Sequence, residues 1–300
     1  MNPQQNPEED SISKSSKAGQ IIGNAFESVV INFITHYIEA NYEAYELLQP
    51  EEGGKLVKLE MLGGTLRQLD TVIVSKNSFD PIALLETKWL KDARHHNDKG
   101  AWILQLREVR KRYPTVRGAV AILAGYWTEG VGVVFMSEAG VRMVLVASDE
   151  EIYGTLQQPL NEFLGDESFI LDVRKMRQRY ERPGDFARFL IHLQDEKRLQ
   201  YIATSWLDFE RERNEQSIIT GKDLIRKAID EILAPLPSNP RIKDLEIALQ
   251  IDTGNTIYQK FDDVESALEF IQSYFNNPEA ILRRISPQPG THLSTGNEES

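Results

Sequence analysis

Two acidic residues and one lysine lie inside segments whose composition is otherwise that of buried β-strands. Asp70 lies within RQLDTVIV, and Glu86 and Lys88 lie within IALLETKWL. Side chains two residues apart on a strand project from the same face, so Glu86 and Lys88 should share a face. Charged groups in a strand that is buried on both sides are costly unless they are paired or bind a metal. The pattern therefore predicts a compact charged cluster on an apolar sheet.

Phosphodiester hydrolysis would give such a cluster a function. Mg²⁺ prefers oxygen ligands and usually takes one or two carboxylates together with phosphate oxygens of a substrate. The ion lowers the pKa of a bound water, and a nearby ammonium group can orient or deprotonate that water. The alternative is a structural ion pair, because an acid-x-Lys triplet alone is a weak signal. The buried strand, and the acid in the strand before it, favour the catalytic interpretation.

The elements that would position these residues begin with a helix at residues 19–48, broken near Asn41. Its apolar side chains recur every three or four residues, and Glu27 lies at the flank of that stripe. Gly23 is on the same side, where a glycine would let another backbone approach closely. Strands are expected at residues 55–61, 67–74, 82–89, 117–125 and 141–147.

A helix is expected at residues 98–113, with Trp102, Leu106, Val109 and Tyr113 on its buried face. Residues 128–139 could form either a short helix or a strand. Strands that are apolar on both faces belong to the middle of a covered sheet. The order of elements therefore predicts an α/β fold with a central mixed sheet flanked by helices.

The rest of the chain divides by composition. Residues 1–17 and 287–300 are expected to be disordered tails. Residues 18–150 would form the core domain and residues 151–236 a helical region, including a long helical run at 201–217. Residues 237–286 would form a small ββα unit, with a hairpin around Thr253-Gly254 and a helix capped by Asp262 or Asp263.

Composition narrows the class of protein. The chain has 300 residues, a net charge of −12 and no cysteine, which excludes disulfides and thiolate metal sites. It has neither a signal-like N-terminus nor an apolar run that could span a membrane, so we expect a cytoplasmic protein without a membrane partner. The basic residues gather at 88–117 and 174–198, which would suit a polyanion held at one face.

The arrangement of Asp70, Glu86 and Lys88 resembles the PD-(D/E)XK nuclease superfamily, whose core is restriction-endonuclease-like. The similarity covers residues 19–147, and Arg67-Gln68 before Asp70 resembles a variant of the motif seen in some members. It departs from the superfamily pattern at Leu69, where the motif has a proline that is often missing. Gln105 is present on the next helix, but Val109 takes the tyrosine position of the exonuclease signature.

The resemblance implies roles for individual residues. Asp70 and Glu86 would bind Mg²⁺, or Mn²⁺ as a substitute, with help from the Thr87 carbonyl, and Lys88 would be the catalytic lysine. Glu27 would be an auxiliary acid. Four side chains near the motif are candidates for substrate binding: Arg67, Gln68, Lys91 and Arg94.

The implied activity is endonuclease cleavage of DNA, of restriction or defence type. The helical region would position DNA or form a dimer interface, and a symmetric homodimer would suit cleavage of both strands. Two alternatives remain open. One is a repair or recombination nuclease acting on branched or single-stranded DNA, and the other is an inactive scaffold that keeps the nuclease fold.

Overall fold

The computed structural model describes residues 7–48, 56–127, 140–178, 180–214, 217–236, 245–250 and 256–277. The chain forms two compact units, Met1–Ala234 and Pro235–Ser300. Within the described ranges, no helix combines the length and the apolar character needed to cross a membrane.

The first unit is built on a five-stranded mixed sheet, in the order β1-β4-β5-β6-β7. Its strands are β1 (Tyr45–Leu47), β4 (Thr71–Ser75), β5 (Pro81–Leu90), β6 (Gly118–Gly125) and β7 (Val141–Ala147). Strands β1, β4 and β5 pair antiparallel, whereas β5, β6 and β7 pair parallel. Every residue of the central strand β5 is buried except Lys88, which is half-buried. The predicted α/β fold with a mixed sheet is confirmed.

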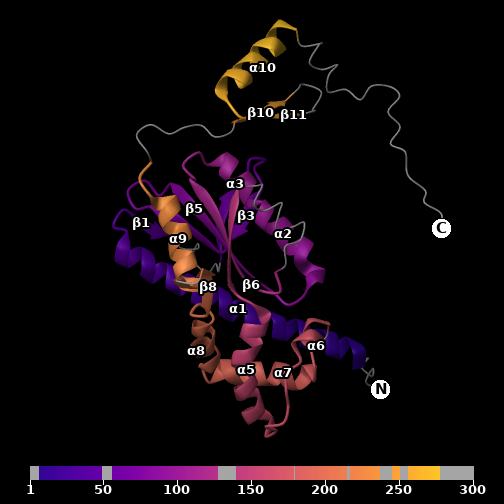
Figure 1. Cartoon of the computed structure of the whole chain (residues 1–300). Helices are drawn as coiled ribbons and strands as arrows, with labels where there is room; N and C mark the ends of the chain where they lie inside the picture. Colours follow the sequence, from indigo (N-terminus) through magenta and orange to yellow (C-terminus); the bar gives the residue numbers. More distant parts are fainter. Residues whose placement is uncertain are drawn as a thin grey trace, which may run out of the picture. The chain divides into compact units, whose positions relative to one another are not determined.

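Helices cover both faces of this sheet (Figure 1). On one face, α1 and α9 lie against the strands, and α7 and α8 pack against α1. The helices on this side are α1 (Pro7–Asn41), α5 (Asp149–Leu164), α6 (Val173–Gln178), α7 (Pro183–Asp195), α8 (Arg198–Ser205) and α9 (Gly221–Leu233). The other face is covered by α2 (His96–Leu104), α3 (Leu106–Arg112) and the hairpin of β2 (Val57–Glu60) and β3 (Leu66–Leu69).

Helices α1 and α9 are tied together by one acid. The hydroxyl groups of Tyr37 and Tyr42 both donate to Oδ1 of Asp230, at 2.6 and 2.5 Å. The two tyrosines belong to the end of α1 and the residue after it, whereas Asp230 belongs to α9. This contact joins the C-terminal end of the first helix to the last helix of the first unit.

Helix α1 differs from the prediction at its start and around Gly23. It begins at Pro7, where the polar sequence offers no apolar period to detect, and it ends at Asn41, where a break was predicted. The prediction that the helix continues to residue 48 is wrong, because residues 45–47 form β1. The expected close approach to Gly23 is wrong, because no other part of the described chain comes within 4 Å of a Cβ built there. Strand β1 was not predicted, because three residues are too few to show a period.

Two predicted elements are each split in the structure. The strand expected at 67–74 bends at Asp70, which separates β3 from β4, and the helix expected at 98–113 breaks at Gln105. Trp102 was expected to be buried, but its side chain is 49% exposed, and Ile103 is buried instead.

The region from 151 to 236 is mainly helical, with one exception. Residues 201–217 were predicted as one helix, but α8 ends at Ser205 and a hairpin follows, formed by β8 (Glu210–Asn214) and β9 (Ser217–Thr220). The alternating charges of ERERN are compatible with a helix and with a strand, so the periodicity of the sequence could not distinguish these two structures. The ambiguous segment 128–139 lies outside the described residues.

The second unit contains the predicted hairpin and helix. Strands β10 (Leu245–Gln250) and β11 (Thr256–Phe261) pair antiparallel, and α10 (Val264–Asn276) follows. Asp263 caps that helix by accepting a hydrogen bond from the backbone N–H of Ser266 at 2.7 Å. The predicted turn at Thr253-Gly254 and the tail 287–300 lie outside the described residues.

Candidate active site

Asp70 occupies the bend at which the chain leaves the β2–β3 hairpin and enters the five-stranded sheet. The register of β4 and β5 pairs Thr71 with Leu85, which brings Asp70 alongside the middle of β5. The backbone N–H of Thr87 donates to Oδ2 of Asp70 at 2.8 Å. This hydrogen bond fixes the Asp70 carboxylate against the strand that carries Glu86 and Lys88.

The ammonium group of Lys88 joins the two acids. Its Nζ lies 2.8 Å from Oδ2 of Asp70 and 2.7 Å from Oε1 of Glu86. It also donates to the carbonyl oxygen of Thr87 at 3.0 Å. The carboxylates of Asp70 and Glu86 therefore lie on one face of the sheet and contact the same nitrogen, so the three charged groups predicted to converge do so.

Arg67 holds Glu86 from the other side. Its Nη2 donates to Oε1 of Glu86 at 2.9 Å and to the carbonyl oxygen of Trp102 at 3.3 Å. The guanidinium carbon lies 4.4 Å from the centroid of the Trp102 ring, and Arg67 is only 4% exposed. Arg67 is thus a positioning residue for Glu86, and its neighbour Gln68 is the exposed one.

One oxygen of this cluster has no partner. Among the described residues, Oε2 of Glu86 is buried and makes no hydrogen bond, although Oε1 of the same carboxylate contacts both Lys88 and Arg67. A buried carboxylate oxygen without a donor is costly, and such atoms in native structures call for an explanation, for instance a water or an ion.

The charges of the cluster shift the pKa values of its members. Burial, and then the charge of Asp70, raise the pKa of Glu86, while Lys88 and Arg67 oppose that rise. Burial alone would lower the pKa of Lys88, but the charges of Glu86 and Asp70 outweigh it and raise that pKa. Lys88 is therefore a cation at neutral pH.

Glu27 approaches the same cluster from α1. Its carboxyl group is half-buried, and burial, followed by the charge of Asp70, raises its pKa to about 7. Lys88 lowers this pKa and Glu86 raises it further, so the side chain senses all three members of the cluster. Near neutral pH the Glu27 carboxyl group is therefore divided between its charged and neutral forms.

This raised pKa predicts that Glu27→Gln stabilises the metal-free protein at alkaline pH. The native state holds the Glu27 proton more tightly than the unfolded state does. The Glu27 carboxyl group therefore stabilises the wild-type fold fully below about pH 4.5, and this stabilisation is lost as the pH rises through about 7. Glutamine mimics the neutral form. In EDTA at pH 8 we expect Glu27→Gln to increase the free energy of unfolding by an amount on the order of 1 kcal/mol, after allowing for solvent screening. The increase should be smaller at pH 5.5.

Thermal unfolding of both proteins at the two pH values measures the effect. Glu39→Gln, on the exposed side of the same helix, is the matched control and should give no pH-dependent difference. A Glu27→Gln gain that is equal at both pH values would contradict the assignment of the shift to Glu27.

The donor atoms of the cluster fit a hard cation. Two carboxylates and the Thr87 carbonyl are oxygen ligands of the kind that Mg²⁺ prefers, and the unpartnered Oε2 of Glu86 is one of them. Across the described ranges, no three or more histidine, aspartate or glutamate side chains come together as a potential metal site. An ion bound at the cluster would therefore complete its ligands with the carbonyl group, water and substrate.

Lys91 and Arg94 lie outside the cluster. Both contact the buried carboxylate of Asp92, at 3.5 and 2.8 Å, beyond the end of β5. Lys91 also lies over the Tyr180 ring, with its Nζ 4.6 Å from the centroid. Two of the three cations predicted to bind substrate, Lys91 and Arg94, are thus paired with Asp92.

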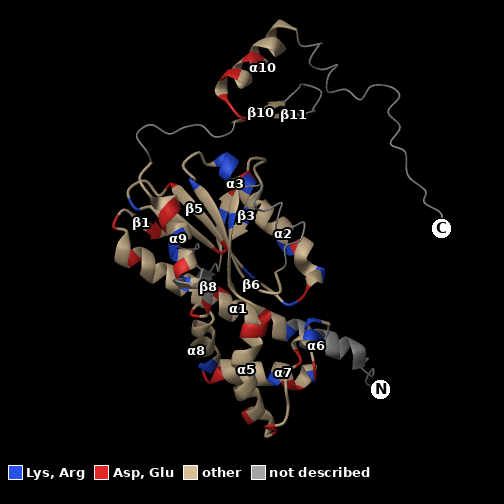
Figure 2. Cartoon of the chain, in the orientation of Figure 1, with Lys and Arg blue, Asp and Glu red and all other residues tan. Residues whose placement is uncertain are grey.

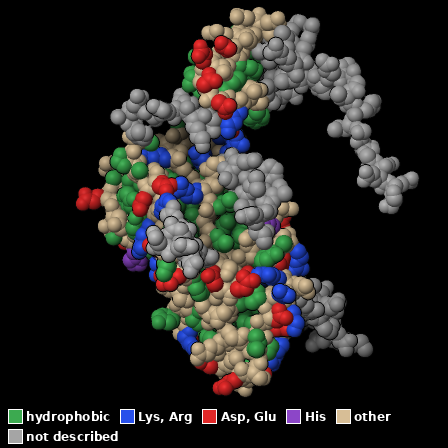
Figure 3. All heavy atoms as spheres, viewed as in Figure 1, with side chains coloured by type: hydrophobic (Ala, Val, Ile, Leu, Met, Phe, Trp, Pro, Cys, Tyr) green, Lys and Arg blue, Asp and Glu red, His purple; other side chains and the backbone are tan. Residues whose placement is uncertain are grey.

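The basic run from Arg174 to Arg198 is largely neutralised. Five of its cations lie in salt bridges with acids: Lys175, Arg177, Arg182, Arg188 and Arg198. Figures 2 and 3 show the two signs of charge interspersed over this part of the molecule. Within the described part of the chain, only Arg174 and Lys197 of this run lack an acidic partner.

Comparisons of the chain with protein families, with curated proteins and with solved structures find no match. The functional argument therefore depends on the geometry of the cluster.

Proposed function

We propose that the chain is a Mg²⁺-dependent endonuclease of the PD-(D/E)XK type that hydrolyses phosphodiester bonds in DNA, of restriction or defence type. One observation carries the proposal: on one face of the sheet the Lys88 ammonium contacts two carboxylates, one from the bend that precedes β4 and one from β5. Asp70 and Glu86 would hold the ion, with the carbonyl group of Thr87 as a further ligand. A divalent cation there would lower the pKa of water and neutralise charge on the phosphate.

The residues of the chain have distinct tasks in this proposal. Lys88, a cation at neutral pH, contacts three oxygens of the cluster in this structure. With the carboxylates turned to an ion, its ammonium group would exchange one of these contacts for a phosphate oxygen as negative charge develops there. Arg67 keeps the Glu86 carboxylate in its orientation. Glu27 lies close enough for the charges of the cluster to shift its pKa, and a pKa of about 7 would suit a group that accepts a proton from water.

A structural ion-pair cluster is the second candidate, favoured by the same Lys88 contacts, which already satisfy one oxygen of each acid. A buried network of this kind can serve a scaffold as well as an enzyme. The two differ in one respect. In the enzyme interpretation the ion is the partner of the buried Oε2 of Glu86, whereas in the scaffold interpretation a bound water must take that place.

The proposal predicts that the purified protein nicks or linearises supercoiled plasmid with Mg²⁺ or Mn²⁺ and stops with excess EDTA. Gel electrophoresis measures the conversion, with branched and single-stranded DNA as parallel substrates. Cleavage restricted to those substrates would move the assignment from restriction to repair. Cleavage that persists with all metal chelated, or no cleavage of any DNA, would reject the proposed mechanism.

A further inference from the structure

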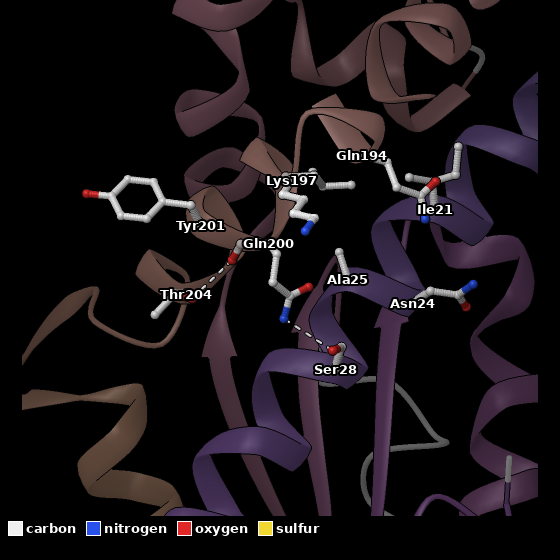
Figure 4. Close-up of a pocket in the computed structure, with 10 residues that line it drawn as sticks. Ile21, Asn24, Ala25, Ser28, Gln194, Lys197, Gln200, Tyr201 and Thr204 are labelled. Carbon is white, nitrogen blue, oxygen red and sulfur yellow. Dashed lines mark hydrogen bonds between the residues drawn. The ribbon is translucent and has the colours of Figure 1, made fainter. Parts of the chain in front are cut away.

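A groove of about 530 Å³ lies on the flank of α1, outside the cluster (Figure 4). Helix α1 forms one wall with Ile21, Asn24, Ala25 and Ser28. The end of α7, the turn after it and helix α8 form the opposite wall. The volume falls within the roughly 300–1,000 Å³ of cavities that hold small organic ligands.

The polar lining of the groove carries no negative charge. None of the described residues that line it is acidic, although the chain as a whole has 46 acids and 34 lysines and arginines. Lys197 is its single cation, and it has no acidic partner within the described part of the chain. Figure 4 shows Lys197 and Gln200 reaching into the groove, whereas Tyr201 points away from it. An unpaired cation in an acid-free groove favours an anionic ligand.

Amide groups supply the remaining polar chemistry. Asn24, Gln194 and Gln200 each present a carboxamide at the groove, and Gln200 donates to the Ser28 hydroxyl at 3.2 Å. A carboxamide offers a donor and an acceptor side by side, which matches the edge of a nucleobase, and adenine best of all. The apolar lining residues Ile21, Ala25 and Leu199 are buried, so a base would be held mainly by the amide groups.

The groove is close to the cluster along α1. Ser28 follows Glu27 directly, and Asn24 lies one helical turn before it, a rise of about 5 Å. Glu27 faces the cluster, whereas Asn24 and Ser28 face the groove. A strand whose phosphate lay at Lys88 could therefore cross α1 and place a neighbouring nucleotide in the groove.

We propose that this groove binds one unpaired nucleotide, with its base held by the amide side chains and its phosphate by Lys197. The nucleotide belongs to a nucleic-acid strand or is free in solution, and both sources share this chemistry. The strand source rests on the proposed nuclease function, since it makes the groove a subsite for a base beside the cleaved bond.

Titration of the full chain in EDTA with deoxyadenosine monophosphate and with a short oligodeoxyadenylate tests the proposal without cleavage. Lys197→Glu should weaken binding at least about tenfold. Arg174→Glu, which reverses the other unpaired cation of the run, is the charge-matched control and should change binding less than twofold. Gln200→Leu should weaken binding several-fold, whereas Gln158→Leu, at an exposed glutamine of α5 that does not line the groove, should not. Thermal unfolding checks that each variant is folded.

Lys197-dependent binding of the oligonucleotide alone supports the strand as the source, and binding of the mononucleotide supports a free nucleotide. Equal losses in Lys197→Glu and Arg174→Glu, or no binding of either probe, would overturn the groove assignment. These outcomes are independent of the plasmid test. Groove binding without cleavage would refute only the nuclease, and cleavage without groove binding would refute only the subsite.

Discussion

Replacing Asp70 by asparagine is expected to lower the rate of plasmid cleavage at least about 10³-fold, the largest change predicted for activity. The amide keeps the shape of the side chain but removes the negative charge that would bind the cation. Asp70 accepts hydrogen bonds from the Thr87 backbone and from Lys88, so its replacement should alter local pairing while the strands remain in register. Lys88→Ala should lower the rate roughly 10²–10³-fold by removing the cation from the developing phosphate charge.

Single-turnover cleavage with saturating Mg²⁺ measures these rates, and circular dichroism with thermal unfolding checks the fold. Asp80→Asn and Lys76→Ala are matched controls, since both side chains are exposed in the β4–β5 turn. They should cleave at the wild-type rate. If Asp70→Asn or Lys88→Ala also cleaves at the wild-type rate, the catalytic role assigned to that residue is wrong. That result would support the interpretation of the cluster as a structural ion pair.

The largest expected effect on stability comes from Arg67→Met. This change leaves Glu86 buried with one partner fewer, and losing one partner of a buried ion pair typically costs about 3–5 kcal/mol. Because Lys88 still contacts Glu86, we expect the free energy of unfolding to fall by roughly 3 kcal/mol, at the lower end of that range. Adding Glu86→Gln removes the buried charge that has lost its Arg67 partner, so the double variant should recover at least half of the lost free energy of unfolding.

Urea unfolding of the single and double variants measures the coupling between the two residues. Arg112→Met is the matched control. Its guanidinium group pairs with Glu60 at 3.0 Å at the surface, where such pairs are worth about 1 kcal/mol or less. An Arg67→Met loss no larger than that of Arg112→Met would show that Arg67 does not stabilise the buried carboxylate.

The sequence was enough to find the cluster because each of its members breaks a pattern. Asp70, Glu86 and Lys88 are charged residues in apolar strands, and antiparallel pairing of neighbouring strands brings them together. The role of Arg67 was missed, although a detectable signal exists. Arg67 and Leu69 lie two residues apart on one strand, so the burial of Leu69 implies the burial of Arg67.

Other features had no local signal. The bend at Asp70 depends on the pairing of β3 with β2, which is set by tertiary contacts rather than by residues 67–74 alone. Trp102 has the spacing of a core residue, but its ring contacts the Arg67 guanidinium and remains half exposed. Two cations of the basic run depend on acids that are distant in sequence, Arg177 on Asp149 and Arg198 on Glu162. The other paired cations of the run have acids no more than six positions away, so their signal was present in the sequence.

The shared acceptor of Tyr37 and Tyr42 has a consequence for any attempt to shorten the protein. A fragment ending near residue 150 would lose α9 and with it Asp230, leaving both phenolic groups without their acceptor. It would also expose to water the apolar side of α1 that α7 and α8 cover. The segment that carries the charged cluster therefore needs the helices encoded after it, and recombinant expression should retain the chain through Ala234.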